Sequence, residues 1–187
     1  YTASMVSDED WDLRDSPLAG EDLNGDGVPE LVHTGLLCPS LYLDCSTYLV
    51  AFDGATLMNQ GALEEVTSGE AFPSVILWPQ RTSEARALGD LDGDGRQEYL
   101  MSSSTAHESS GEIRILSFKQ QASGALGLTV LDTFVGSHEG AELGRRGTSL
   151  VVEDLNEDGM PDLVTVSKGA TPESRELTIQ ALTSFAL

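Results

Sequence analysis

One acidic nine-residue pattern occurs three times in this chain and constrains its fold more than any other feature. The copies span residues 22–30, 90–98 and 154–162, so their first residues lie 68 and then 64 positions apart. Each copy has an acid or amide side chain at positions 1, 3 and 5, a glycine at position 6 and a carboxylate at position 9. Position 2 is always leucine, which is expected to anchor the loop in a core. Recurrence at such a period is typical of repeat proteins.

Oxygen-bearing side chains at alternating positions of a short loop suit a hard cation. Calcium takes six to eight oxygen ligands at about 2.3–2.6 Å and tolerates irregular geometry, whereas magnesium loses water reluctantly and needs a stricter octahedron. Glycine at position 6 permits the positive φ of a sharp turn. At position 7, Val28, Arg96 and Met160 would each contribute only a backbone carbonyl. The side chains predicted to bind about three calcium ions are Asp22, Asn24, Asp26 and Glu30, then Asp90, Asp92, Asp94 and Glu98, then Asp154, Asn156, Asp158 and Asp162.

The EF-hand and the hairpin turn are two other local structures with a similar sequence pattern. An EF-hand requires a bidentate Glu at position 12, where these copies carry His33, Met101 and Thr165. The residues after each copy are rich in β-formers or alternate apolar with polar, which predicts strands rather than helices. A hairpin turn would explain the Asn-Gly and Asp-Gly pairs of any single copy, but it needs no carboxylate at position 9. Converging carboxylates would also repel one another unless a cation lay among them.

The rest of each period predicts further strands. We expect strands before the loops, directly after them and one hairpin later, with a less regular fourth strand. Their expected positions are 16–20, 84–89 and 147–152, then 31–37, 99–104 and 163–167, then 47–52, 112–118 and 176–182, and for the fourth strand 128–134 and the region of 75–78. Four antiparallel strands in each period of about 60 residues are typical of propeller blades.

The sequence therefore predicts an all-β fold of about three four-stranded β-propeller blades. We expect one propeller segment over residues 1–187, with repeats at roughly 10–70, 71–136 and 137–187. Propellers close with about four to eight blades, so three blades predict part of a larger or multi-chain propeller. Further blades, from the same or another chain, would cover the apolar sheet surface that is left open at each end.

These repeats resemble a known family. The run Gly89–Gly95 followed by Glu98, Tyr99 and Leu100, with its two sister copies, is similar to the FG-GAP or VCBS-type repeat of calcium-binding β-propellers, which includes the integrin α-subunit head. The resemblance implies metal binding at the twelve side chains named above. It departs from the family in two respects, since the Phe-Gly…Gly-Ala-Pro signature is only faint and Glu157 replaces the glycine at position 4.

Composition excludes several classes of function. With 31 Asp and Glu against 10 Lys and Arg, the chain of 187 residues has a formal charge of −21, which repels nucleic-acid backbones and anionic lipid heads. We expect no membrane insertion, because no apolar stretch reaches the roughly 18 residues of a span. The acidic first twenty residues do not resemble a leader, which predicts a processed or excised chain.

The two cysteines bear on the compartment. A disulfide between Cys38 and Cys45 would close a short loop and imply an oxidising environment, and two reduced thiols are the alternative. We expect a secreted or cell-surface protein, or a periplasmic one.

Binding is the expected function, since no catalytic motif occurs. The connections at 37–45, 102–110 and 168–175 differ in sequence and are expected to share the rim opposite the metal loops, where recognition usually resides. Leu41, Tyr42 and Leu43 are the candidate contact with a protein or glycan partner, or else they pack under their own loop. The alternatives are a structural subunit of a filament or surface assembly, and a catalytic or non-catalytic part of a polysaccharide-degrading enzyme.

Overall fold

The computed structural model describes twelve stretches of the chain. They are residues 11–12, 20–23, 25–37, 46–52, 54–60, 84–120, 126–146, 149–152, 154–155, 157, 162–171 and 174–181. The chain divides into two compact units, Tyr1–Pro79 with Phe118–Thr129, and Gln80–Ser117 with Val130–Leu187.

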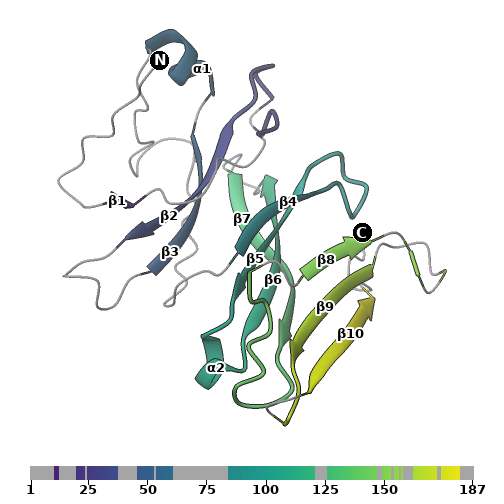
Figure 1. Cartoon of the computed structure of the whole chain (residues 1–187). Helices are drawn as coiled ribbons and strands as arrows, with labels where there is room; N and C mark the ends of the chain where they lie inside the picture. Colours follow the sequence, from purple (N-terminus) through teal and green to yellow (C-terminus); the bar gives the residue numbers. More distant parts are fainter. Residues whose placement is uncertain are drawn as a thin grey trace. The chain divides into compact units, whose positions relative to one another are not determined.

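Most of the described structure is β-sheet, in three sheets of antiparallel strands (Figure 1). The first sheet has the order β1-β2-β3, the second β4-β5-β6-β7 and the third β10-β9-β8. The predicted all-β fold is confirmed, and none of the three described sheets closes on itself. The strands are β1 Trp11–Asp12, β2 Leu31–Leu37, β3 Ser46–Phe52, β4 Glu84–Gly89, β5 Glu98–Ser103, β6 Glu112–Gln120, β7 Leu126–Val135, β8 Ser149–Val152, β9 Asp162–Lys168 and β10 Arg175–Ala181.

These strands follow the sequence expectations closely. The three strands after the acidic loops and the three one hairpin later all lie within two residues of their predicted limits, and the fourth strand predicted at 128–134 is β7. The region of 75–78 lies outside the described residues. Two short helices were not predicted, α1 Gly54–Gln60 and α2 Ala106–Ser109. Neither described helix has the length and apolarity needed to cross a membrane.

The second and third sheets repeat one another in register. Glu98, the last residue of the second acidic loop, pairs with Ser117 on β6, and Asp162, the last residue of the third loop, pairs with Ala181 on β10. Both pairs therefore span the same length of chain. The pairing of Ala85–Ala87 with β5 is repeated by Ser149–Val151 with β9, whereas the register shift between Ala87 and Gly89 on β4 has no equivalent on β8. Since side chains alternate between the two faces of a strand, residues at equivalent positions, which we call counterparts, share the same face in both sheets.

The first sheet follows this scheme with a longer connection. Leu31 on β2 pairs with Phe52 on β3, 21 positions later, whereas Tyr99 on β5 pairs with Leu116 on β6, 17 positions later. The β2–β3 connection is therefore four residues longer than the β5–β6 connection. Since each pair comes first after its acidic loop, Leu31 is the counterpart of Tyr99, and Phe52 is the counterpart of Leu116.

The core of the second unit joins its two sheets. Leu100 on β5 and both Ile113 and Ile115 on β6 are buried together with Leu163 on β9 and Leu143 from the segment between the sheets. Apolar area removed from water contributes about 25 cal/mol per Å², so this shared cluster holds the second and third sheets together.

A close backbone approach supports the same junction. Gly144 has a φ of +74°, and a Cβ there would lie 2.6 Å from Ser102 Cβ and 2.9 Å from Ile113 Cγ1. The Ser102 hydroxyl donates a hydrogen bond of 2.6 Å to the Gly144 carbonyl, and the Lys168 amide donates to the Ala141 carbonyl at 2.7 Å. Residues 141–144 therefore form a strap, held by β5 on one side and β9 on the other.

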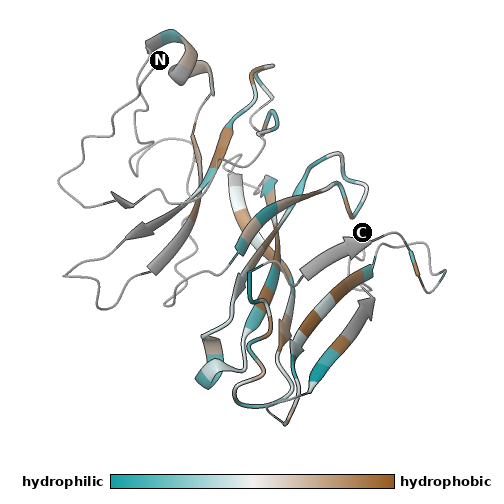
Figure 2. Cartoon of the chain, viewed as in Figure 1, coloured by the Kyte–Doolittle hydropathy of each residue, from teal (hydrophilic) through white to brown (hydrophobic). Residues whose placement is uncertain are grey.

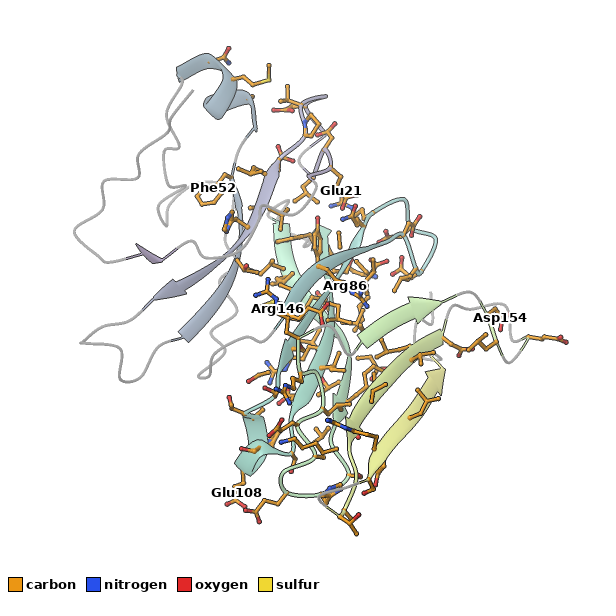
Figure 3. The ribbon with its side chains drawn as sticks, in the orientation of Figure 1. Glu21, Phe52, Arg86, Glu108, Arg146 and Asp154 are labelled. Carbon is orange, nitrogen blue, oxygen red and sulfur yellow. The ribbon has the colours of Figure 1, made fainter. Side chains whose placement is uncertain are left out.

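The connections after β5 and β9 begin at the ends of these strands that are opposite the acidic loops. Figure 3 places Glu108, in the β5–β6 connection, and Asp154, in the third loop, at opposite ends of the second unit. His107, Glu108 and Ser109 all have left-handed backbone conformations, which are uncommon for residues other than glycine. The buried Glu112 carboxylate accepts a hydrogen bond from Arg114 and lies 2.6 Å from His107 Nε2. This charged cluster fixes the shape of the connection.

Candidate metal centre

The second acidic loop, residues 90–98, joins β4 to β5 and is described in full. The Asp90 carboxylate accepts backbone hydrogen bonds from Gly93 at 2.7 Å and from Gly95 at 2.9 Å. Asp92 accepts from the Asp94 amide at 3.1 Å, and Asp94 accepts from the Arg96 amide at 2.9 Å. These short-range bonds wind the loop around its own carboxylates, so the side chains at positions 1, 3 and 5 are held by backbone amides.

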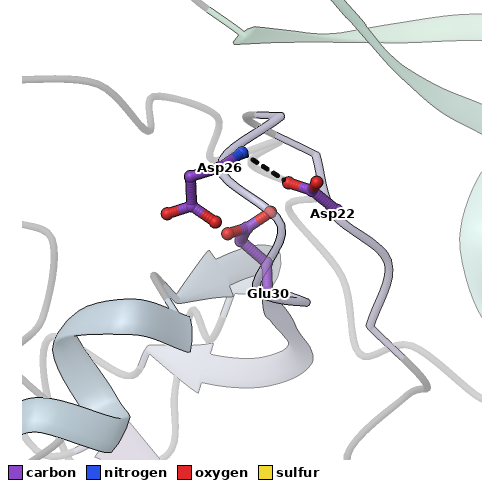
Figure 4. A group of neighbouring side chains, drawn as sticks. All are labelled: Asp22, Asp26 and Glu30. Atoms are coloured by element: carbon purple, nitrogen blue, oxygen red, sulfur yellow. Dashed lines mark hydrogen bonds between the residues drawn. The ribbon is translucent and has the colours of Figure 1, made fainter.

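The first loop, residues 22–30, has the same construction. Asp22 accepts hydrogen bonds from the amides of Gly25, Asp26 and Gly27 at 2.7–3.0 Å, and Asp26 accepts from Val28 at 2.8 Å. Figure 4 shows the carboxylates of Asp26 and Glu30 next to each other within the turn, with Asp22 opposite them. The two loops are thus alike in bonding as well as in sequence.

The ninth-position carboxylate closes every loop in the same way. One oxygen of this carboxylate accepts the amide N–H of the leucine at position 2. The distance is 2.5 Å from Leu23 to Glu30, 2.6 Å from Leu91 to Glu98 and 2.7 Å from Leu155 to Asp162. All three acceptors are buried, with at most 1% of the residue exposed. This contact ties the start of each loop to the first residues of the following strand.

Two groups of carboxylates converge closely enough to share an ion. Oxygens of Asp22, Asp26 and Glu30 lie within 4.8 Å of one another, and so do oxygens of Asp90, Asp92 and Glu98. Two ligands that are each about 2.4 Å from one ion can be at most about 4.8 Å apart. Both groups therefore have the spacing of a metal site, and they could hold a metal ion.

Burial makes the second site costly without a cation. Loss of hydration raises the pKa of the Glu98 carboxyl above its usual 4.5, and the negative charges of Asp92 and Asp94 raise it further. The Leu91 amide and the Ser117 hydroxyl act in the opposite direction by favouring the charged form. A cation in the loop would offset both the repulsion and the desolvation cost.

The second oxygen of the ninth-position carboxylate is the strongest pointer to a ligand. Among the described residues the buried Oδ1 of Asp162 makes no hydrogen bond. The buried Oε1 of Glu98 makes none of good geometry, although the Ser117 hydroxyl lies near enough to favour the charged carboxylate. Buried polar atoms are nearly always paired, because an unmade bond costs about 1–3 kcal/mol. A bound cation would satisfy these oxygens.

The structure brings together six of the predicted ligands in the two groups above. Asp94 lies in the second loop, with its carboxylate on the Arg96 amide. Asp154 and Asp162 lie at the two ends of the third loop, where Asp162 is buried and Asp154 is half-buried. Asn24, Asn156, Asp158 and Met160 lie outside the described residues, as do Cys38, Cys45, Leu41, Tyr42 and Leu43.

Sequence reasoning missed the backbone donors of these loops. The leucine at position 2 was expected only as a core anchor. Leu23 is buried and Leu91 packs against the core, but Leu155 is 54% exposed. What position 2 shares in all three loops is its amide, which has no signature in sequence because every residue except proline carries one.

The glycine predictions are confirmed where they can be seen, and the third loop adds a finding. Gly27 and Gly95 have φ values of +86° and +84°. At position 4, Gly25 and Gly93 are also left-handed, and Glu157 keeps this conformation with a φ of +61°. A non-glycine residue there indicates that the loop shape is imposed by its other contacts.

Comparison with known proteins adds no assignment. No protein-family model matches the chain, and no curated protein matches it either.

Proposed function

We propose that this chain is an extracellular, calcium-stabilised β-propeller module of the FG-GAP or VCBS type that binds a protein or glycan partner. The observation that carries the proposal is the ninth-position carboxylate. In the second loop it is fully buried, uses one oxygen to close the loop and lies within 4.8 Å of two further carboxylates.

Calcium is the ion that this donor set favours. The donors are carboxylates on a short loop with irregular spacing, and hard oxygen ligands in tolerant geometry suit calcium better than magnesium. The second loop, with Asp92 where the others have Asn24 and Asn156, offers one more carboxylate and should bind most tightly. An affinity near the 10⁻⁴–10⁻³ M range of extracellular modules would suffice outside the cell.

The ion would have a structural role. Each loop joins two neighbouring strands of one sheet, as β4 and β5 are joined by residues 90–98. Cancelling the carboxylate repulsion there would fix the strand ends and keep the sheet rigid, while leaving the opposite ends of the strands free to vary.

Recognition would reside at those opposite ends. The β5–β6 connection is shaped by left-handed residues and by the contacts of the buried Glu112 carboxylate, whereas in the β9–β10 connection the Thr171 amide donates to the Ser174 hydroxyl. Different loops on equivalent, rigid strands are a common arrangement for binding. Leu41, Tyr42 and Leu43 of the first connection remain the proposed contact.

Thermal unfolding tests the proposal. The melting temperature of the chain should rise by about 3–10 °C when about 10 mM calcium replaces a chelator, and by much less with magnesium. An unchanged midpoint would refute calcium stabilisation. Binding to an array of glycans and extracellular proteins, with and without calcium, then tests the recognition step.

A further inference from the structure

One face of each sheet carries the same set of counterpart residues. In the second sheet Leu100 pairs with Ile115 and Ser102 pairs with Ile113 across β5 and β6. Directly opposed residues point to the same side of a sheet, so these four share one face, which we call the stacking face. All four are fully buried.

The stacking face of the first sheet is buried as well. Its counterparts are Val32 and Thr34 on β2, opposite Ala51 and Leu49 on β3. None of these four residues is more than 6% exposed.

The stacking face of the third sheet is open. Its counterparts include Val164 and Val166 on β9 and Leu177 on β10, which pairs with Val166 as Ile113 pairs with Ser102. The two valines are half-buried and Leu177 is 68% exposed, whereas its counterpart Ile113 is fully buried. Figure 2 shows hydrophobic residues along β9 and a hydrophobic position on β10. The same position is therefore covered in one sheet and exposed in the next.

The residues that cover the stacking face of the second sheet come from the repeat that follows it. Ile113 lies in one cluster with Leu143 of the strap and Leu163 of β9, and Gly144 lies against its side chain. All three covering residues belong to the following repeat.

We propose that the stacking face of the third sheet, marked by Val164, Val166 and Leu177, is the docking surface for one further repeat of this same kind. This inference rests on the proposed blade architecture and names its partner. The incoming sheet would present a face like the buried side of β9, with Leu163, Thr165 and Ser167, preceded by a glycine-bearing strap.

A second copy of this chain does not fit the surface as well. His33 and Phe52, which hold positions on the required face of the first sheet, are already buried. A copy could offer only its own open face, and two chains that each carry a charge of −21 repel one another.

A tandem chain tests the inference. The extended protein consists of residues 1–181 followed by a second copy of residues 118–187, so that the added repeat follows the third as the third follows the second. In the natural chain, Leu177→Asp should lower the melting temperature by less than about 2 °C, because the side chain is exposed. In the extended chain the same change, made only in the first copy, should lower it by about 5–10 °C, because it buries an unpaired charge. Val135→Asp is the matched control, since Val135 is 48% exposed on β7 and should be tolerated in both chains.

Several results would overturn the inference. One is an equally small effect of Leu177→Asp in both chains. Another is an added repeat that proteases remove while the natural chain survives, since the face would then have failed to accept it. A natural chain that is dimeric and becomes monomeric with Leu177→Asp would assign the face to a second copy instead. Failure of the calcium proposal is recognised separately, by a natural chain whose melting temperature ignores calcium.

Discussion

Replacing Glu98 by Gln should stabilise the metal-free protein and weaken its stabilisation by calcium. Glutamine has the same shape, and its amide oxygen can still accept the Leu91 N–H, so the loop can stay closed. The change removes the negative charge that lies within 4.8 Å of Asp90 and Asp92 oxygens. At that distance two charges repel by about 3.5 kcal/mol at an effective dielectric constant of about 20, and by about 0.9 kcal/mol in water.

The partly hydrated site lies toward the weaker limit, because Asp90 is exposed and Asp92 half-buried. Two such repulsions make Glu98→Gln stabilising by about 1–2 kcal/mol in chelator, or about 2–8 °C in melting temperature for a chain of this size. With calcium at about 10–100 times its dissociation constant, an occupied site contributes about 1.4–2.7 kcal/mol. The variant should lose most of that contribution, so its melting temperature should respond less to calcium.

The assay is differential scanning fluorimetry or calorimetry in chelator and in calcium, beside calorimetric titration of the ion. Glu139→Gln is the control, since it removes one exposed carboxylate outside the loops and should leave the response to calcium unchanged. Lower stability of Glu98→Gln in chelator, together with an unaltered response to calcium, would refute the reasoning that this carboxylate is a strained ligand.

Three further predictions concern pH, packing and stoichiometry. In chelator the contribution of Glu98 to stability should increase as the pH falls from neutral toward 4.5, because its raised pKa makes the folded state bind this proton before the unfolded state does. That stabilisation is complete below the usual pKa of 4.5 and is lost as the pH rises through the raised value. In calcium the trend should reverse because protons displace the ion, and melts across this range with Glu98→Gln as control will check both signs. Gly144→Ala should destabilise the chain by about 2–4 kcal/mol, because its Cβ would meet Ser102 and Ile113 at a φ of +74°. Gly95→Ala is the control and should cost only about 1 kcal/mol, since the space around its Cβ is open. Equal losses of stability in urea unfolding would contradict the close packing of the strap. Titration of the natural chain should give about three calcium ions, and Asp90→Asn should remove the tightest of them, so an unchanged stoichiometry and affinity would exclude the second loop.

Much of this fold could be predicted because its signals are local. The acidic loops indicated where strands begin, and the alternation of apolar residues after them predicted β2, β5 and β9 to within two residues. The convergence of Asp90, Asp92 and Glu98 also follows from spacing, since a nine-residue loop between adjacent strands must bring its ends together. The strand pairing of the third sheet repeats that of the second at the same interval that separates their acidic loops.

Other features depended on contacts that spacing does not reveal. The left-handed turn at His107–Ser109 lies beside the ion pair of the half-buried Arg114 and the buried Glu112, and no local sequence preference favours that backbone. Glu157 likewise adopts a glycine conformation that its own side chain disfavours. The turn at His107–Ser109 is held by tertiary contacts, since the Ser109 carbonyl accepts the Glu142 amide and His107 contacts Glu112, and such contacts override local preference.

The longer connection between β2 and β3 shows how freely such a protein can be altered. Four additional residues between these strands leave the order of their sheet and the bonding of the first acidic loop unaffected. The connection at these strand ends can therefore be lengthened without disturbing the ends that carry the acidic loops. If the proposed recognition resides in these connections, selection or an engineer could vary specificity on one side of the strands while leaving the opposite side untouched.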